Sequence, residues 1–127
     1  MRRVFKTRSF GRWMRKTELT DQALCGAVAE MARGLIDADL GGGVVKKRVA
    51  LPGRGKSGGA RTLVATNKDS RWFFMFGFEK KDQANVSAKE LAALQTIAAD
   101  LFKLSPTQLD AHVESAALLE ICHECEE

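Results

Sequence analysis

The side chains with the clearest chemical potential are cations within residues 44–81. They are Lys46, Lys47, Arg48, Arg54, Lys56, Arg61, Lys80 and Lys81. A cluster of this kind binds phosphate groups without sequence preference. It could also cleave RNA, which carries its own nucleophile, the 2′-hydroxyl, if the protein orients that group and stabilises the transition-state charge with Arg and Lys. A lysine whose pKa is lowered by neighbouring cations could transfer the proton. The residues alone leave binding and catalysis both open.

Two familiar phosphate chemistries are not predicted. Residues 55–57 match the end of the nucleotide-binding P-loop pattern, but Ala50 stands where its first glycine belongs. A P-loop also needs a helix after it, whereas a strand-like run follows here. Two-metal nucleases need clustered carboxylates, and the cationic region offers only Asp69 and Glu79. We therefore expect neither nucleotide hydrolysis nor metal-dependent cleavage by this region.

The cysteines and histidines do not predict a metal centre. Cys122 and Cys125 form a C-x-x-C around His123 in the acidic tail, and His112 is the only other histidine. A structural zinc site normally needs four ligands, and no second pair exists. Cys25 lies in an apolar helical stretch, where a buried free thiol is the usual state. We expect no metal, no cofactor and no disulfide framework.

Charge is distributed unevenly along the 127 residues. The net charge of +4 combines 18 Lys and Arg against 7 Asp and Glu in residues 1–81 with 2 against 9 in residues 82–127. A strongly cationic portion attracts polyanions. No apolar run reaches the ~20 residues that cross a bilayer, and the basic N-terminus lacks the apolar stretch of a signal peptide. The expected location is cytoplasmic, with no membrane partner.

The hydrophobic pattern predicts an α+β fold in the order β-α-α-β-β-β-α. We expect a small antiparallel sheet packed on N-terminal helices, with a C-terminal helix after it. The expected elements are a strand at 2–7, helices at 10–16 and from Thr20 to near Gly34, strands at 44–51, 60–66 and 72–78, and a helix from Ser87 to Leu101. Ser9, Thr20 and either Asn85 or Ser87 are the expected N-caps, and Ser87 with Glu90 has capping-box spacing. One domain spans 1–127, with 105–127 as a C-terminal extension that a Ser105-Pro106 start signal opens.

Strand alternation assigns the cations and aromatics to faces. Lys46 and Arg48 share one face of their strand, and Lys47 points the opposite way, where an acidic helix could pair with it. In the last of the three central strands, Trp72, Phe74, Phe76 and Phe78 share one parity, and Phe73, Met75 and Gly77 share the other. At least one of these rows should belong to the core.

Three segments carry a resemblance to a known family. They are G-x-G-K-S-G-G-x-R-T-L at 53–63, F-F-M-F-G-F-x-K at 73–80 and N-V-x-x-x-E-L at 85–91. With the order of elements, they resemble the RelE-like toxins of type II toxin–antitoxin systems, in the branch grouped with HigB-type toxins. The likeness runs from Arg3 to about Leu104.

The resemblance implies a ribosome-dependent mRNA endonuclease that inhibits translation. It implies as partners the ribosome, mRNA and a co-encoded antitoxin with a DNA-binding portion. Arg61 is then expected to stabilise the phosphate and the transition state, and Lys56 or Lys81 to transfer protons. The expected RNA-binding residues are Lys46, Arg48, Arg54 and Lys80.

The chain departs from the family pattern in one respect. The family often has tyrosine just before the arginine that Arg61 matches, but Ala60 stands here and the chain contains no tyrosine. Two alternatives to the nuclease remain. The ParE-like branch shares the fold and targets DNA gyrase, and a non-catalytic RNA-binding module would use the same cations. The density of cations near Arg61, Lys80 and Lys81 favours the nuclease.

Overall fold

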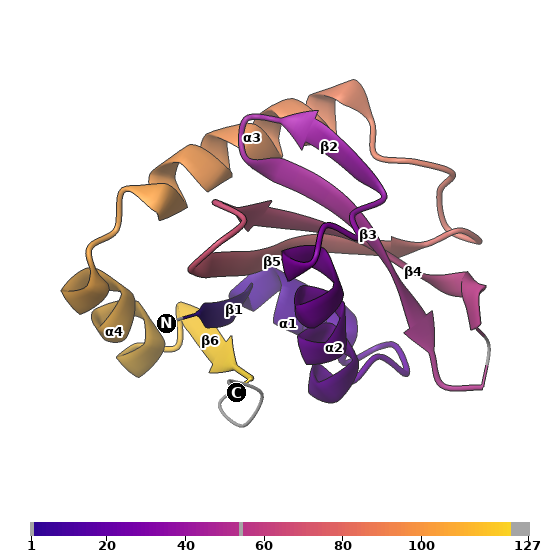
Figure 1. The fold of residues 1–127 in the computed structure, drawn as a ribbon, viewed down its shortest axis with the longest axis horizontal. Coiled ribbons are helices and arrows are strands. Elements are labelled where there is room, and N and C mark those ends of the chain that lie inside the picture. The colour runs from indigo at the N-terminus through magenta and orange to yellow at the C-terminus, as the bar shows by residue number, and fades with distance from the viewer. Residues whose placement is uncertain (1, 54, 123–127) are drawn as a thin grey trace.

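The computed structural model describes residues 2–53 and 55–122, with only the backbone described for 55–57. These residues form one six-stranded sheet and four helices (Figure 1). The strands are β1 (Arg3–Thr7), β2 (Ala38–Gly41), β3 (Val44–Leu51), β4 (Gly55–Thr66), β5 (Arg71–Glu79) and β6 (Leu118–Ile121). The helices are α1 (Arg8–Met14), α2 (Asp21–Ala32), α3 (Ala88–Phe102) and α4 (Pro106–Glu114). The predicted α+β class is confirmed.

The sheet is larger than expected, and one of its pairings is parallel. Its strand order is β2-β3-β4-β5-β1-β6. β1 runs parallel to β5, whereas the β2/β3, β3/β4, β4/β5 and β1/β6 pairs are antiparallel. β2 lies in a stretch where the sequence analysis expects no strand. Gly41, Gly42 and Gly43 all have positive φ, a conformation that glycine adopts without steric cost, and they turn the chain so that β2 pairs with β3.

Helices cover both faces of the sheet. Residues of α1 and α2, such as Phe10 and Leu24, pack with Val45 and Phe74 on one face. On the other face, residues of α3 and α4 pack with Phe5, Phe73 and Leu63. Trp72, Phe73 and Phe74 are therefore all fully buried, and both aromatic rows belong to the core.

A β-bulge in β5 changes the predicted alternation. Leu63 pairs with Phe76 while the next residue, Val64, pairs with Phe74, so Met75 is the extra residue. Such a bulge reverses the face of every residue beyond it. Phe76 and Phe78 consequently pack on the same side as Phe73, contrary to the parity expected from the sequence.

The helix starts largely follow the sequence signals. Thr20 caps α2, and Ser87 with Glu90 forms a complete capping box at α3. Ser105 forms a second capping box with Gln108, with Pro106 in the first turn of α4. The exception is α1, which begins at Arg8 because Thr7, and not Ser9, accepts a hydrogen bond from the Phe10 N–H.

The expectation of a free, buried Cys25 is wrong. Cys25 of α2 forms a disulfide with Cys122, which directly follows β6, across a sequence separation of 97 residues. The pairing is possible because β6 lies antiparallel to β1, which places the end of the C-terminal segment over the layer containing α2. The remaining part of the predicted C-x-x-C segment, His123 and Cys125, lies outside the described residues.

Candidate phosphate-binding groove

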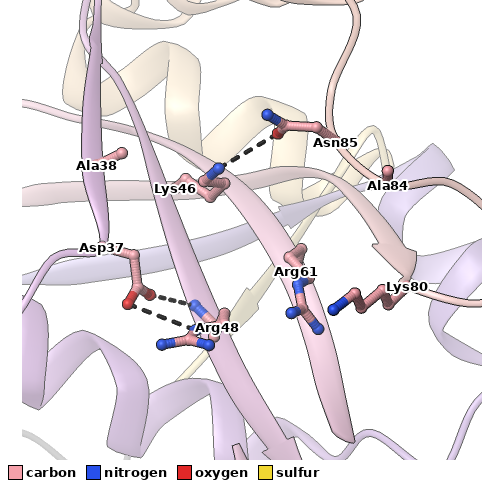
Figure 2. Close-up of a pocket in the computed structure, with 8 residues that line it drawn as sticks. All are labelled: Asp37, Ala38, Lys46, Arg48, Arg61, Lys80, Ala84 and Asn85. Carbon is pink, nitrogen blue, oxygen red and sulfur yellow. Dashed lines mark hydrogen bonds and ion pairs between the residues drawn. The ribbon is translucent and has the colours of Figure 1, made fainter. Parts of the chain in front are cut away.

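Four cationic side chains line one open groove beside strands β3 and β4 (Figure 2). The groove has a volume of about 380 Å³, within the roughly 300–1,000 Å³ of small-ligand sites. Lys46 and Arg48 come from β3, Arg61 from β4 and Lys80 from the turn after β5. The rest of the lining is Asp37, Ala38, Ala84 and Asn85. The site is built from strands on one side and from the connections before β2 and before α3 on the other.

The register of the sheet brings two arginines directly opposite each other. Arg48 of β3 pairs with Arg61 of β4. Like charges at directly opposed positions destabilise a sheet. An anion lying between the two guanidinium groups would remove that repulsion, so the arrangement suits a phosphate.

The four cations differ in what holds them. Asp37 Oδ2 accepts a 2.6 Å hydrogen bond from the Arg48 backbone N–H. The other carboxylate oxygen, Asp37 Oδ1, lies 3.7 Å from the side-chain Nε of Arg48. Lys46 Nζ donates to Asn85 Oδ1 at 3.2 Å. Arg61 Nη1 donates to the Gly59 carbonyl at 3.1 Å, which orients its guanidinium but does not neutralise it.

The charge of the groove therefore remains largely uncompensated. Among the described residues, no carboxylate forms an ion pair with Lys46, Arg61 or Lys80. Figure 2 shows the tip of Lys80 pointing toward the Arg61 guanidinium. Two cations that face one space without a carboxylate between them are arranged to bind an anion.

Some cations outside the groove do have carboxylate partners. Arg3 donates to both Glu120 and Asp110, and these hydrogen bonds raise the pKa of its guanidinium, with Glu120 contributing most. Lys6 pairs with Asp21. Lys68 pairs with the exposed Asp39, and its hydrogen bond lowers the pKa of that carboxyl.

The position of Lys47 confirms the prediction that its side chain points to the opposite face of β3 from Lys46 and Arg48. Its side chain points to the face opposite Lys46 and Arg48, where it is 3% exposed. Its Nζ lies 2.8 Å from Glu30 Oε1 of α2 and donates to the Leu35 carbonyl at 2.8 Å. This lysine joins a helix to the sheet and takes no part in the groove.

The structure gathers four of the seven predicted site residues, Lys46, Arg48, Arg61 and Lys80, in the groove. Lys81 is exposed in the turn beside Lys80 and is not part of the lining. Arg54 and the side chain of Lys56 lie outside the described part of the chain, so their predicted roles stay predictions.

Asp37 and Asn85 are groove residues that sequence reasoning did not assign. Both lie in connections between elements, where alternation gives no information about direction. Asn85 belongs to the N-V-x-x-x-E-L segment, which was the one available signal.

Within residues 2–53 and 55–122, no group of three or more His, Cys, Asp or Glu is placed to hold a metal ion. No described helix is long and apolar enough to cross a membrane.

Comparison with known families decides the family of this chain. The sequence model described as the RelE toxin of the RelE / RelB toxin-antitoxin system matches residues 2–121. The chain belongs to the RelE toxin family. The match includes α4 and β6, so the family likeness extends beyond Leu104 to the strand that completes the sheet. No curated protein matches the sequence.

Membership of the RelE family carries two general properties. Its toxins are generally endoribonucleases, and each is paired with an antitoxin of the RelB kind. The cationic groove of this RelE toxin is accordingly the first place to look for RNA chemistry.

Proposed function

We propose that this RelE toxin cleaves mRNA on the ribosome without a metal ion and is neutralised by a co-encoded antitoxin. The observation that carries the proposal is the groove itself. Four cations converge there, and Asp37, the one carboxylate among the described lining residues, is already bound to Arg48. Such a surface favours a phosphodiester over a neutral or cationic ligand. We also retain the assignment to the HigB-type branch as a prediction.

Arg61 is the residue best placed to stabilise the transition state. It lies between Arg48 on the neighbouring strand and Lys80 across the groove. A guanidinium presents a rigid fork of donors that suits the equatorial oxygens of a phosphorane. In the reaction, a lysine of the site accepts the proton of the 2′-hydroxyl and the 2′-oxygen attacks phosphorus. The bond from phosphorus to the 5′-oxygen breaks, and the products carry a 2′,3′-cyclic phosphate and a 5′-hydroxyl.

The leaving 5′-oxygen needs a proton, and a lysine can supply it. Lys80 lines the groove, which makes it a candidate beside Lys56 and Lys81, the two lysines that the sequence favours. Separate substitutions of Lys56, Lys80 and Lys81 would show which lysine transfers the proton. Lys46 and Arg48, with Arg54, would hold flanking phosphates.

The composition of the lining supports dependence on the ribosome. None of the eight described lining residues is aromatic, so among them only the guanidinium planes of Arg48 and Arg61 could stack on a base. Single-stranded RNA usually needs such stacking to be held in a defined conformation. An mRNA already ordered in the ribosomal A site would arrive with that requirement met.

The antitoxin is expected to cover the groove with an acidic segment and to carry a DNA-binding portion. Charge complementarity to the four groove cations is the physical reason for the acidic segment. Co-expression with the adjacent gene should restore growth, and the two proteins should purify together.

The cellular test separates the nuclease from a gyrase inhibitor and from a passive RNA-binding module. The toxin is expressed from an inducible promoter, and growth, the integrity of a reporter mRNA and plasmid supercoiling are followed together. The proposal predicts growth arrest with broken mRNA and normal supercoiling. Arrest with intact mRNA and altered supercoiling would overturn it in favour of gyrase, and uninterrupted growth would favour a module without chemistry.

A further inference from the structure

β6 is a short strand at the edge of the sheet. It comprises only Leu118–Ile121 and pairs on one side, with β1 (Figure 1). Leu118 and Ile121 bury their side chains, and the Arg3 guanidinium donates to the Glu120 carboxylate at 2.8 and 2.9 Å. A strand of this length with a single neighbour belongs to the parts of a fold that open most easily.

The backbone on both sides of β6 is in an unfavourable conformation. Among the described residues, three other than glycine have a positive φ, and they are Lys68, Ala116 and Cys122. Ala116, with φ 64°, lies in the turn before β6, and Cys122, with φ 70°, directly follows the strand. Residues with a side chain keep this left-handed conformation only where surrounding contacts offset its cost. β6 is therefore held in place against backbone strain at each end.

The Cys25–Cys122 disulfide fastens the strained end of β6 to another layer of the fold. Cys25 lies on α2, in the core cluster that also contains Leu24 and Val28, and Cys122 packs against this cluster. The two cysteines are 97 residues apart in the sequence. A disulfide that closes so long a loop stabilises the folded chain by constraining the unfolded one. The covalent bond thus offsets the strain at Cys122.

We propose that Cys25 and Cys122 form a redox-sensitive latch, whose disulfide holds β6 on the sheet and whose reduction lets β6 open. The inference rests on the proposed function in one respect. A toxin that acts on translating ribosomes works where thiol reductants are abundant, and disulfides in such a compartment are usually transient. The state of this pair would then report the redox state around the toxin and set how firmly the end of the sheet is closed.

Cys122 is the cysteine that a reductant reaches first. Cys25 is 6% exposed, whereas Cys122 is partly exposed. A thiolate of a dithiol reductant attacks Cys122 Sγ, the S–S bond breaks, and Cys25 leaves as a thiolate that takes up a proton. The second thiol of the reductant then displaces Cys122, which takes up the second proton. The dithiol ends as a disulfide and has given two electrons to the cysteine pair.

Substitutions of single cysteines separate the latch from a general effect of thiols. Cys25→Ala and Cys122→Ser each remove the disulfide from a different side, and the exposed position of Cys122 makes the second variant the milder one. Cys125→Ser is the matched control, because it removes a cysteine three positions along the chain from Cys122 and leaves the Cys25–Cys122 pair intact.

The experiment is hydrogen–deuterium exchange of the whole chain, read by mass spectrometry over seconds to minutes, before and after treatment with dithiothreitol. Reduction should accelerate exchange in the peptide containing β6 at least about tenfold, while the peptide containing β4 stays protected over the same times. Reoxidation with oxidised glutathione should restore the protection. Cys25→Ala and Cys122→Ser should exchange like the reduced wild type without any reductant, and Cys125→Ser should follow the wild type in both states.

Three results would overturn the latch. One is a β6 peptide that stays protected after reduction, which would make the disulfide a passive brace. Another is loss of protection in β4 at the same rate as in β6, because the whole fold would then open and not the strand alone. The third is an oxidised wild type in which peptide mapping finds no Cys25–Cys122 link. Because no ribosome or RNA is present, a toxin with a working latch that leaves mRNA intact would keep the latch and lose the nuclease.

Discussion

Neighbouring residues of β3 show two opposite uses of a cation. Lys47 is 3% exposed and has Glu30 and the Leu35 carbonyl as partners on the face that α2 covers. Lys46 and Arg48, one position away on either side, point into the groove with Arg61 and Lys80. A difference of one residue along a strand thus separates a cation that holds the fold together from cations that are open to a ligand.

The comparison shows that partners, and not charge alone, separate the structural cation of β3 from the cations that line the groove. Lys47 is buried and charged, so it needs Glu30 to offset the loss of water. The Arg61 guanidinium donates a hydrogen bond to the Gly59 carbonyl and has no described carboxylate partner. It also lies opposite another arginine, Arg48. The fold tolerates that arrangement without gaining stability from it, which is expected where a ligand supplies the missing charge.

The largest effect is expected at Arg61. Arg61→Ala should reduce mRNA cleavage about 100- to 1,000-fold, the usual cost of removing a transition-state donor. Its free energy of unfolding should change by no more than about 0.5 kcal/mol, because the substitution also removes a like-charge pair. Arg61→Lys keeps the charge but loses the fork, so it should recover only part of the rate. Cleavage of a reporter mRNA and urea unfolding measure the two quantities, and full toxicity of Arg61→Ala would remove Arg61 from the site.

The reverse pattern is expected at Lys47. Lys47→Ala should lower the free energy of unfolding by about 1–3 kcal/mol, less than for a fully buried pair because the Glu30 side chain is 32% exposed. The folded fraction should cleave mRNA at the wild-type rate. Lys68→Ala, which breaks an exposed pair with Asp39, is the control and should leave the free energy of unfolding nearly unchanged. A Lys47→Ala protein that is stable but inactive would contradict the division between the two faces.

The adjacent pair Lys80 and Lys81 gives a smaller but sharper contrast. Lys80→Ala should lower the cleavage rate about tenfold or more, since it removes a groove cation, and Lys81→Ala should change it less than about twofold. Single-turnover rates on ribosome-bound mRNA measure both. If Lys81→Ala has the larger effect, the assignment of Lys81 as a catalytic residue is supported and the groove must extend beyond its present lining.

The sequence was most informative where structure is decided locally. The capping box at Ser87 and the helix start at Ser105-Pro106 depend on residues at most three positions apart. The sides of Lys46, Lys47 and Arg48 follow from alternation within one strand. The family resemblance added Arg61 and Lys80, which β4 and the turn after β5 bring to the same groove.

What the sequence did not predict depends on distant partners. The four residues of β2 and the four of β6 form strands only because β3 and β1 lie beside them. The bulge at Met75 is visible only in the register with β4, and the Cys25–Cys122 disulfide joins residues 97 apart. Asp37 and Asn85 enter the groove from connections, whose direction no periodic pattern records.

The most direct test of the central claim is primer extension on one defined mRNA, translated in a purified system with and without the toxin. The account predicts cuts at fixed codon positions that need ribosomes, persist when the free protein is first treated with a chelator, and leave 5′-hydroxyl ends. An mRNA that stays intact while the toxin still arrests growth, or cuts that require an added metal ion and leave 5′-phosphates, would contradict it.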